Sequence, residues 1–398
     1  NGTLLVHRGK IVAVGIAVAI PPGATEHDVS GRLLMPGLVD THSHVGQVAG
    51  ADGSAPIQPE VRALDSVNVR HAGIQKAQAG GITTVNVMPG SGHLLSGQTV
   101  YLKLRDGSTV EELAIRLRDG AIAGGMKMAN GTNSRKDPPF PGSRGKSAAL
   151  VREQYVKAQD YCGKRSDPKV AADKKPARDL AMEGLCEVLS GRRIVHHHTH
   201  RHDDIVTVLR LAEEFGFRVV LHHVSEGWKV AEEIARAKVP ASIIQIDSPG
   251  GKLEAVDLEF ETGAILEKAG VLLAYHTDDP ITDSRLFLRS AAMGVRAGLS
   301  RQTALEALTI NGARMLELES RVGSLEPGKD ADFILLDGDP LSVYTKVLET
   351  WIKAFENSPL TPDDLNQIPF TLLIPGCTVT FMQHKRCVSG GLTANCGE

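Results

Sequence analysis

The segment Met35-Pro-Gly-Leu-Val-Asp-Thr-His-Ser-His44 ends a short apolar run with two histidines separated by one residue. On a β-strand, residues i and i+2 point to the same face, so the imidazoles of His42 and His44 would lie side by side. Two neutral imidazoles at a strand end can bind one metal ion. A bare His-x-His more often lies on an exposed strand, but here Pro36-Gly37 predicts a preceding turn and Asp40 stands two residues before His42.

This segment resembles the signature of the amidohydrolase superfamily, whose first barrel strand carries a metal-binding His-x-His. Further along the chain, the run Gly323-Ser-Leu-Glu-Pro-Gly-Lys-Asp-Ala-Asp332 is similar to the same family almost letter for letter. The resemblance extends over roughly residues 3 to 352. Within the superfamily, the chain most resembles imidazolonepropionase-like hydrolases and their peptidase-like relatives.

Composition and charge are those of an ordinary globular chain. Its 398 residues are 42% hydrophobic and 23% charged, enough for one large domain plus a smaller one. The net charge of −3 gives no electrostatic case for nucleic acid or an anionic membrane. No apolar run reaches the ~18 residues of a spanning helix. No signal peptide is visible, so we expect a cytoplasmic protein, although a native start upstream of Asn1 would leave export open.

The five cysteines are too few and too scattered for a disulfide scaffold. Cys162 and Cys186 are isolated in the sequence, whereas Cys377, Cys387 and Cys396 cluster near its end. We expect the last three to be free thiols, with a metal-binding remnant as the alternative.

From residue 36 onward, strand-like and helix-like segments alternate. The strand candidates are Leu38–His42, Ile82–Met88, Thr99–Leu104, Gly124–Ala129, Arg193–His198, Arg218–His223, Val239–Gln245 and Val271–His276. The helix candidates between them are Val67–Ala79, Val110–Ala121, Ala148–Gln159, Asp203–Phe215, Trp228–Ala237 and Leu258–Ala269. Such alternation over about 240 residues fits an α/β fold, a (β/α)8 TIM-like barrel, which typically takes about 250 residues. We assign it to residues 36–319.

The two ends of the resembling region read as short strands joined by Gly and Pro turns. In the amidohydrolase family, segments like these pair in a small β-sandwich. The resemblance therefore implies a small β-sandwich domain formed by residues 1–35 plus 320–352. The family usually closes with another strand there, but residues 353–398 are turn-rich, and we assign no structure to this tail.

Active sites of such barrels lie at the carboxyl-terminal ends of the strands. A lysine, Lys127, stands between apolar neighbours on the fourth strand. Either it reaches solvent or, as the resemblance implies, it is carboxylated and bridges two metals. On the fifth strand, the family pattern aligns His198 as a metal ligand and His200 as a pocket residue, and a swap of these roles stays open. His196, His197 and His202 are then packing or surface residues.

The sixth strand ends in two adjacent histidines. Neighbours on a strand face opposite ways, so only one of His222 and His223 should bind metal. The family pattern, in which Glu-Gly follows the histidine, matches His223-Val-Ser-Glu226-Gly227 and selects His223. At the eighth strand end, the resemblance implies that Asp278, rather than Asp279, binds metal and shuttles protons.

The resemblance implies a metal-dependent hydrolase of carbon–nitrogen bonds in amides, cyclic amides or dipeptide-like substrates. One or two divalent ions, zinc by expectation, would be held by the residues already described. These ligands are His42, His44, Lys127, His198, His223 and Asp278. A metal-activated hydroxide would attack the carbonyl carbon, with Asp278 as general base and then acid and His200 steadying the intermediate.

Loops after the strands set specificity. The glycine-rich second loop contains His93, and the fourth, Asn130–Lys146, contains Arg135 among four cations and one anion. This loop and Arg201 both suggest a clamp for a substrate carboxylate. The alternative is that the loop is an ordinary solvated surface loop without a binding role. The expected partner is therefore a small molecule, and a homo-oligomer stays open.

Two rival functions are compatible with the same resemblance. Superfamily deaminases usually place Glu three residues after the fifth-strand histidine, where this chain has Arg201, although Glu226 stands three residues after His223. A catalytically inactive scaffold would have lost metal ligands, whereas this chain retains the full set.

Overall fold

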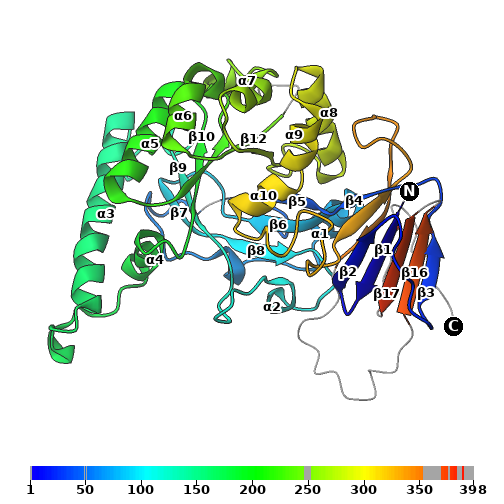
Figure 1. Cartoon of the computed structure of the whole chain (residues 1–398). Coiled ribbons are helices and arrows are strands. Elements are labelled where there is room, and N and C mark those ends of the chain that lie inside the picture. The colour runs from blue at the N-terminus through cyan, green and yellow to red at the C-terminus, as the bar shows by residue number, and fades with distance from the viewer. Residues whose placement is uncertain are drawn as a thin grey trace.

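The computed structural model describes residues 2–48, 50, 52–245 and 252–352, together with the backbone of 369–374, 377–382 and 388–389. Figure 1 shows a large part with helices around strands and, beside it, a small part built from strands of both chain ends. Most of the residues predicted to bind metal lie at or near the carboxyl-terminal ends of the larger part's parallel strands.

The main sheet of the large part has six strands. In spatial order they are β13 (Leu273–Tyr275), β12 (Ala241–Ile243), β11 (Val219–His223), β10 (Val195–Thr199), β9 (Met126–Ala129) and β7 (Leu95–Gln98). The run from β9 to β13 is parallel throughout. These strands are buried along their whole length, as expected of parallel strands covered on both faces.

A second sheet contains β5 (Leu38–Ser43), β6 (Ile82–Val87) and β8 (Val100–Lys103). β5 and β6 are parallel, and the end of β5 meets the chain beyond β13, where the Asp278 amide donates to the His42 carbonyl at 2.9 Å. Gly37 permits the close approach at the start of β5, because a Cβ there would lie 2.2 Å from the Thr83 side chain.

The third predicted barrel strand departs from the expected pattern. β8 lies where it was predicted but runs antiparallel to β6, and β7 runs antiparallel to β9. No helix separates β6 from β8, and a parallel return needs a crossover, usually a helix. The chain therefore doubles back, and Thr99 links the two sheets, because its N–H donates a hydrogen bond to the Gly125 carbonyl at 2.9 Å. The structure thus shows a mixed α/β architecture rather than eight parallel strands.

Helices cover these sheets. Their bounds are α1 (Ala72–Ala79), α2 (Val110–Leu113), α3 (Arg144–Ser166), α4 (Leu180–Leu189), α5 (His202–Phe215), α6 (Ala231–Ala237), α7 (Thr262–Lys268), α8 (Phe287–Arg296), α9 (Arg301–Ala307) and α10 (Ile310–Met315). The predicted helix over Val110–Ala121 is wrong beyond Leu113, since Ala114 and Arg116 form β-bridges. Among the described residues, no helix is long and apolar enough to cross a bilayer.

Helix α5 shows how the local sequence produces these elements. Ile205, Val208 and Leu211 recur at helical spacing and are buried, so one face packs against the sheet. Gly216 ends the helix in the left-handed conformation, with φ +70°. The helix begins at His202, three residues after the last residue of the histidine-rich strand β10.

The small part contains two sheets. One has the order β2 (Lys10–Gly15), β1 (Thr3–His7), β17 (Cys377–Met382), β16 (Pro369–Ile374) and β3 (Thr25–Asp28). The other has the order β18 (Val388–Ser389), β15 (Val347–Trp351), β14 (Phe333–Leu336) and β4 (Leu33–Pro36). Leu4, Ile11 and Phe333 are buried in a common apolar cluster. The tail left unassigned from sequence therefore supplies strands, with β17 parallel to β1 and β16 parallel to β3.

The expectation of isolated cysteines is wrong for one pair. Cys162 on α3 and Cys186 on α4 form a disulfide with a Cα–Cα distance of 5.7 Å. Disulfides are typical of oxidising compartments, so this bond weighs against the cytoplasmic location, which stays a prediction. The side chain of Cys377, and Cys387 and Cys396 altogether, lie outside the described residues.

The disulfide should stabilise the packing of α3 against α4. Replacing Cys162 and Cys186 together by alanine should lower the free energy of unfolding by about 3 kcal/mol, because the bond closes a loop of 24 residues in the unfolded chain. Denaturant unfolding measures the loss, with the same comparison under reducing conditions as its control. Unchanged stability, or two alkylatable thiols in the unreduced protein, would contradict the bond.

Candidate metal centre

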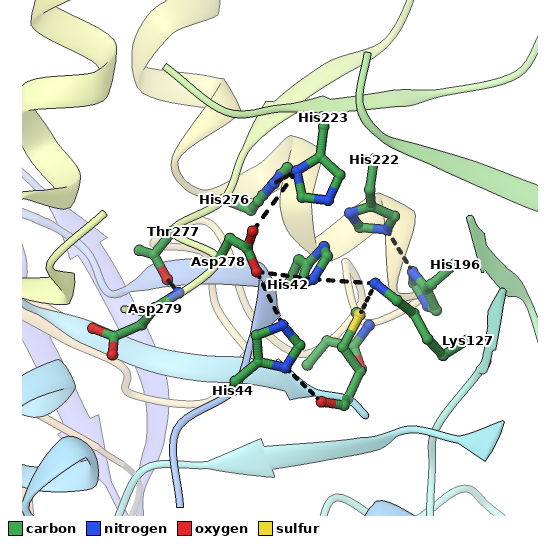
Figure 2. Close-up of polar contacts among 12 residues, drawn as sticks. His42, His44, Lys127, His196, His222, His223, His276, Thr277, Asp278 and Asp279 are labelled. Atoms are coloured by element: carbon green, nitrogen blue, oxygen red, sulfur yellow. Dashed lines mark hydrogen bonds and ion pairs between the residues drawn. The ribbon is translucent and has the colours of Figure 1, made fainter. Parts of the chain in front are cut away.

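The strand ends bring the predicted metal-binding residues into one cluster, part of which Figure 2 shows. Its members are His42 and His44 from the end of β5, Lys127 on β9, His198 on β10, His223 at the end of β11 and Asp278 after β13. Four of them are buried, whereas His44 and Asp278 retain slight exposure. Residues separated by up to 236 positions in the chain therefore meet at one edge of the sheets.

Asp278 and the His-x-His pair form the first group of candidate ligands. The Asp278 Oδ1 lies 3.0 Å from His44 Nε2 and 3.3 Å from His42 Nε2. The His44 Nδ1 lies 2.8 Å from the Met88 carbonyl oxygen, which orients the ring. Burial would raise the pKa of Asp278, but the hydrogen bond with His44 and the nearby imidazoles hold it below its usual value. The carboxylate is therefore ionised and available as a ligand.

His198, His200 and His223 form a second group. Their candidate ligand atoms all lie within 4.8 Å of one another, and the rings of His198 and His223 have centroids 4.4 Å apart. Among the described residues, the Nε2 atom of each ring has no hydrogen-bond partner. The predicted ligands and the predicted pocket residue His200 thus share one group, so either role for His200 is compatible with the geometry.

The chemistry of both groups fits a divalent metal ion. Burial holds the pKa of His42, His198 and His223 well below the usual value, so these imidazoles are neutral at pH 7. A neutral imidazole is the form that donates a lone pair to a metal. Buried nitrogens without partners are costly, and a bound ion would satisfy them.

Lys127 borders the first group. Its buried Nζ lies 3.2 Å from His42 Nε2 and 3.2 Å from the Met88 sulfur. Figure 2 shows the Lys127 side chain directed toward His42. Burial lowers the pKa of Lys127 to about 7, although the Asp278 charge opposes the shift. A large fraction of this amine is therefore neutral near pH 7.

The buried carboxylate of Asp40 anchors the chain next to Asp278. Asp40 on β5 accepts hydrogen bonds from the Thr277 hydroxyl at 2.5 Å, the Thr277 amide at 3.1 Å and the His42 amide at 3.2 Å. On the other side, Asp279 pairs with Lys76 at 2.7 Å. Asp278 between them has φ +51°, a left-handed conformation that such anchoring must maintain.

The expected opposite facing of the β11 histidines, on which His223 was chosen over His222 as the ligand, does not hold in the structure, whereas the choice of a single ligand stays a prediction. His223 has φ +71° and Val224 φ +53°, so the chain leaves the extended conformation in which neighbours alternate. Both rings approach His42, each with a centroid distance of 4.9 Å. His222 also forms a further group with His42 and His276 in which the candidate ligand atoms lie within 4.8 Å of one another.

Two further buried histidines, His196 and His276, have hydrogen-bond partners next to the cluster. His196, expected to be a packing or surface residue, is buried and lies between Tyr101 Oη at 2.9 Å and His222 Nε2 at 3.0 Å. His276 Nε2 lies 3.1 Å from His223 Nδ1, and its other nitrogen contacts Ser242. From the sequence, His276 is expected to orient ligands or to line the pocket, and its contact with the predicted ligand His223 is compatible with the first role.

The predicted substrate-binding residues are less available than expected. The Arg201 guanidinium forms two hydrogen bonds to Asp203, at 2.9 and 3.0 Å. Arg135 donates to the Gly131 carbonyl at 3.3 Å. His93 is buried against Phe140, with ring centroids 5.3 Å apart. None of these contacts shows a substrate site, so the three assignments stay predictions.

Similarity to known proteins in sequence and in fold identifies the family of this chain. The amidohydrolase from Thermotoga maritima MSB8 is 35% identical in sequence, with a TM-score of 0.82 over 88% of this chain and 93% of that chain. The chain belongs to the amidohydrolase family. A profile described as "Amidohydrolase family" also matches residues 170–353.

More distant relatives carry varied names. The amidohydrolase tasK of Hapsidospora irregularis is 30% identical over 88% of this chain, but the chain spans only 39% of that longer protein. An imidazolonepropionase of Pseudomonas paraeruginosa is 28% identical, with 83% of this chain and 86% of that protein covered. A 5-methylthioadenosine/S-adenosylhomocysteine deaminase of Symbiobacterium thermophilum is 26% identical, with 85% and 81% covered. Amidohydrolase membership therefore does not select the substrate.

The Asp40–Thr277 contact should hold the cluster together. Thr277→Val removes the hydroxyl that binds the buried Asp40 carboxylate, and should lower the free energy of unfolding by about 1.5–3 kcal/mol. Thr277→Ser keeps the hydroxyl and should cost less than half as much. Denaturant unfolding of both variants provides the test, and equal losses would contradict a specific role for this hydrogen bond.

Proposed function

We propose that this chain is a metal-dependent hydrolase of carbon–nitrogen bonds in small molecules, namely amides, cyclic amides or dipeptide-like compounds. The observation that carries the proposal is the pair of adjoining candidate ligand groups. In one, His42 and His44 face the ionised Asp278 carboxylate, and in the other the Nε2 atoms of His198, His200 and His223 have no partner among the described residues. His42, His44 and Asp278 would hold one divalent ion. His198 and His223, with His200 beside them, would hold a second. Zinc accepts this set of nitrogen and oxygen ligands.

When bound, a divalent ion lowers the pKa of water toward ~7 and polarises a carbonyl group. Asp278 accepts the proton of the attacking water, because its ionised carboxylate lies within the ligand cluster. A carbon–oxygen bond forms and the carbon–nitrogen bond breaks. Asp278 then returns the proton to the departing nitrogen, so that the products are a carboxylic acid and an amine.

His200 can stabilise the tetrahedral intermediate. Its Nδ1 lies 2.7 Å from the Ser225 hydroxyl, which can donate to that nitrogen. The proton of the neutral ring then resides on Nε2, the atom without a partner among the described residues. In this tautomer, Nε2–H can donate to a developing oxyanion.

Lys127 would bridge the two ions as a carbamate. The neutral amine is the form that attacks carbon dioxide, and burial makes this form abundant at pH 7. The reaction joins nitrogen to carbon and releases one proton. It replaces a buried amine by an anionic oxygen donor next to His42, which reduces the repulsion between two dications.

Activation of metal-free protein should therefore depend on bicarbonate. Zinc added in carbon dioxide-depleted buffer should restore little activity, and bicarbonate should increase the recovery several-fold. A time course of activity after zinc addition measures this effect. Equal recovery with and without bicarbonate would show that Lys127 acts as a free amine.

Amide hydrolysis is supported over deamination by the position of Glu226. Its carboxylate accepts from the His202 amide at 3.0 Å, contacts His202 Nδ1 at 2.5 Å and pairs with Lys229. The carboxylate thus binds the first turn of α5. We also propose that the substrate bears a carboxylate that binds the Arg135 guanidinium. Arg201 is less suited to this role, because its charge is already paired with Asp203.

Turnover of N-acyl amino acids, dipeptides and cyclic amides by the zinc-loaded protein tests the function. Asp278→Asn should lower kcat by at least about 100-fold, because it removes the proton acceptor. His223→Ala should lower both zinc content and turnover. Asp257→Asn changes an exposed carboxylate that pairs with Lys229, outside the cluster, and serves as the matched control.

Two results would contradict this function. One is full turnover in both cluster variants. The other is ammonia release from aminated heterocycles without hydrolysis of any amide, which would assign the chain to the deaminases.

A further inference from the structure

Glu254 is a buried acidic residue that the sequence did not single out. It lies on the short 3-10 helix η4 (Leu253–Ala255), between β12 and α7, and its side chain is 1% exposed. One carboxylate oxygen, Oε2, accepts the Thr132 amide at 2.7 Å. Gly131 makes this approach possible, because a Cβ there would lie 2.4 Å from the same oxygen. The turn after β9 therefore fixes the carboxylate in place.

The other oxygen points toward the metal-binding cluster. Glu254 Oε1 lies 3.9 Å from His198 Nε2, and neither atom has a hydrogen-bond partner among the described residues. The distance exceeds the usual 2.7–3.2 Å of an N–H···O bond. A shift of less than about 1 Å would close it, and would satisfy two buried polar atoms that are costly when unpaired.

The neighbouring histidines show a pattern that His198 lacks. His44 Nδ1 contacts the Met88 carbonyl, His200 Nδ1 contacts Ser225, and His223 Nδ1 contacts His276. Each ring thus has one nitrogen engaged and one facing the cluster. Metal-binding histidines usually donate their second ring N–H to a carboxylate, a carbonyl or water. Within the described residues, Glu254 is the one carboxylate that the ion-pair distances place within 4.0 Å of a His198 nitrogen.

We propose that Glu254 is a positioning residue of the metal centre, in which it accepts the Nε2–H of His198. This contact fixes the His198 tautomer and leaves the Nδ1 lone pair for the ion. It also places a negative charge near the bound cation without occupying a coordination position. The inference rests on the proposed metal-dependent function, and it adds a second layer to the site on the side of β10.

Zinc affinity of the whole chain tests the proposal by competition with a chromophoric chelator. Glu254→Ala should weaken zinc binding by about 10–100-fold, the usual effect of losing such a partner. Glu254→Gln keeps an oxygen that can accept the bond but loses the charge, and should show a smaller loss. Glu259→Gln, on the exposed segment just before α7, is the matched control and should bind zinc as the wild type does.

Cobalt(II) spectra and unfolding of the metal-free protein separate the alternatives. We expect the alanine variant, when saturated with cobalt, to keep the wild-type coordination number. Zinc affinity unchanged in both Glu254 variants would overturn the proposal, as would a loss of metal-free stability alone, which would reduce Glu254 to an anchor for Thr132. A cobalt spectrum with one ligand fewer would also overturn it, because Glu254 would then bind the ion directly. Wild-type protein that binds neither metal would instead contradict the proposed function, and this inference with it.

Discussion

The buried carboxylate of Asp40 is the contact on which the arrangement of the site depends. It joins β5 to the segment after β13 by accepting the amides of His42 and Thr277 and the Thr277 hydroxyl. The Asp278 amide adds a bond to the His42 carbonyl across the same seam. Two ligand-bearing segments from distant parts of the chain are thus held in a fixed register. Burial raises the pKa of Asp40 to about 7, so placing this carboxyl in the interior opposes folding unless its hydrogen bonds are kept.

Burial explains why the metal-free cluster is costly for stability and why its imidazoles are suited to bind a metal. An uncharged imidazole can be buried at modest cost, but a nitrogen without a partner remains unsatisfied. His42, His198, His200 and His223 each keep such a nitrogen among the described residues. A metal ion would take up such a nitrogen of His198 and of His223, so the same burial that depresses the imidazole pKa values prepares the site for metal. Glu254 and Ser225 would act one layer further out, by orienting the rings.

Much of this site could be predicted from the sequence, because strand alternation and the family resemblance act on local patterns. They placed His42, His44, Lys127, His198, His223 and Asp278 at strand ends, and the structure brings these residues together. Asp and His are enriched at positive φ, but residue type does not say at which position the chain adopts it, so the approach of both His222 and His223 to His42 could not be predicted. Glu254 and the Cys162–Cys186 bond depend on contacts between distant segments that no local pattern encodes. The antiparallel β8 follows from an absent crossover helix, a feature that short strand candidates do not reveal.

Metal binding by the convergent histidines and Asp278 underlies the whole proposal. Anomalous X-ray diffraction at the zinc absorption edge, from crystals of the zinc-loaded protein, tests this binding. We expect a strong peak within coordination distance of His42, His44 and Asp278, and a second next to His198 and His223. The absence of any peak at the cluster, with zinc found only at surface residues, would contradict it.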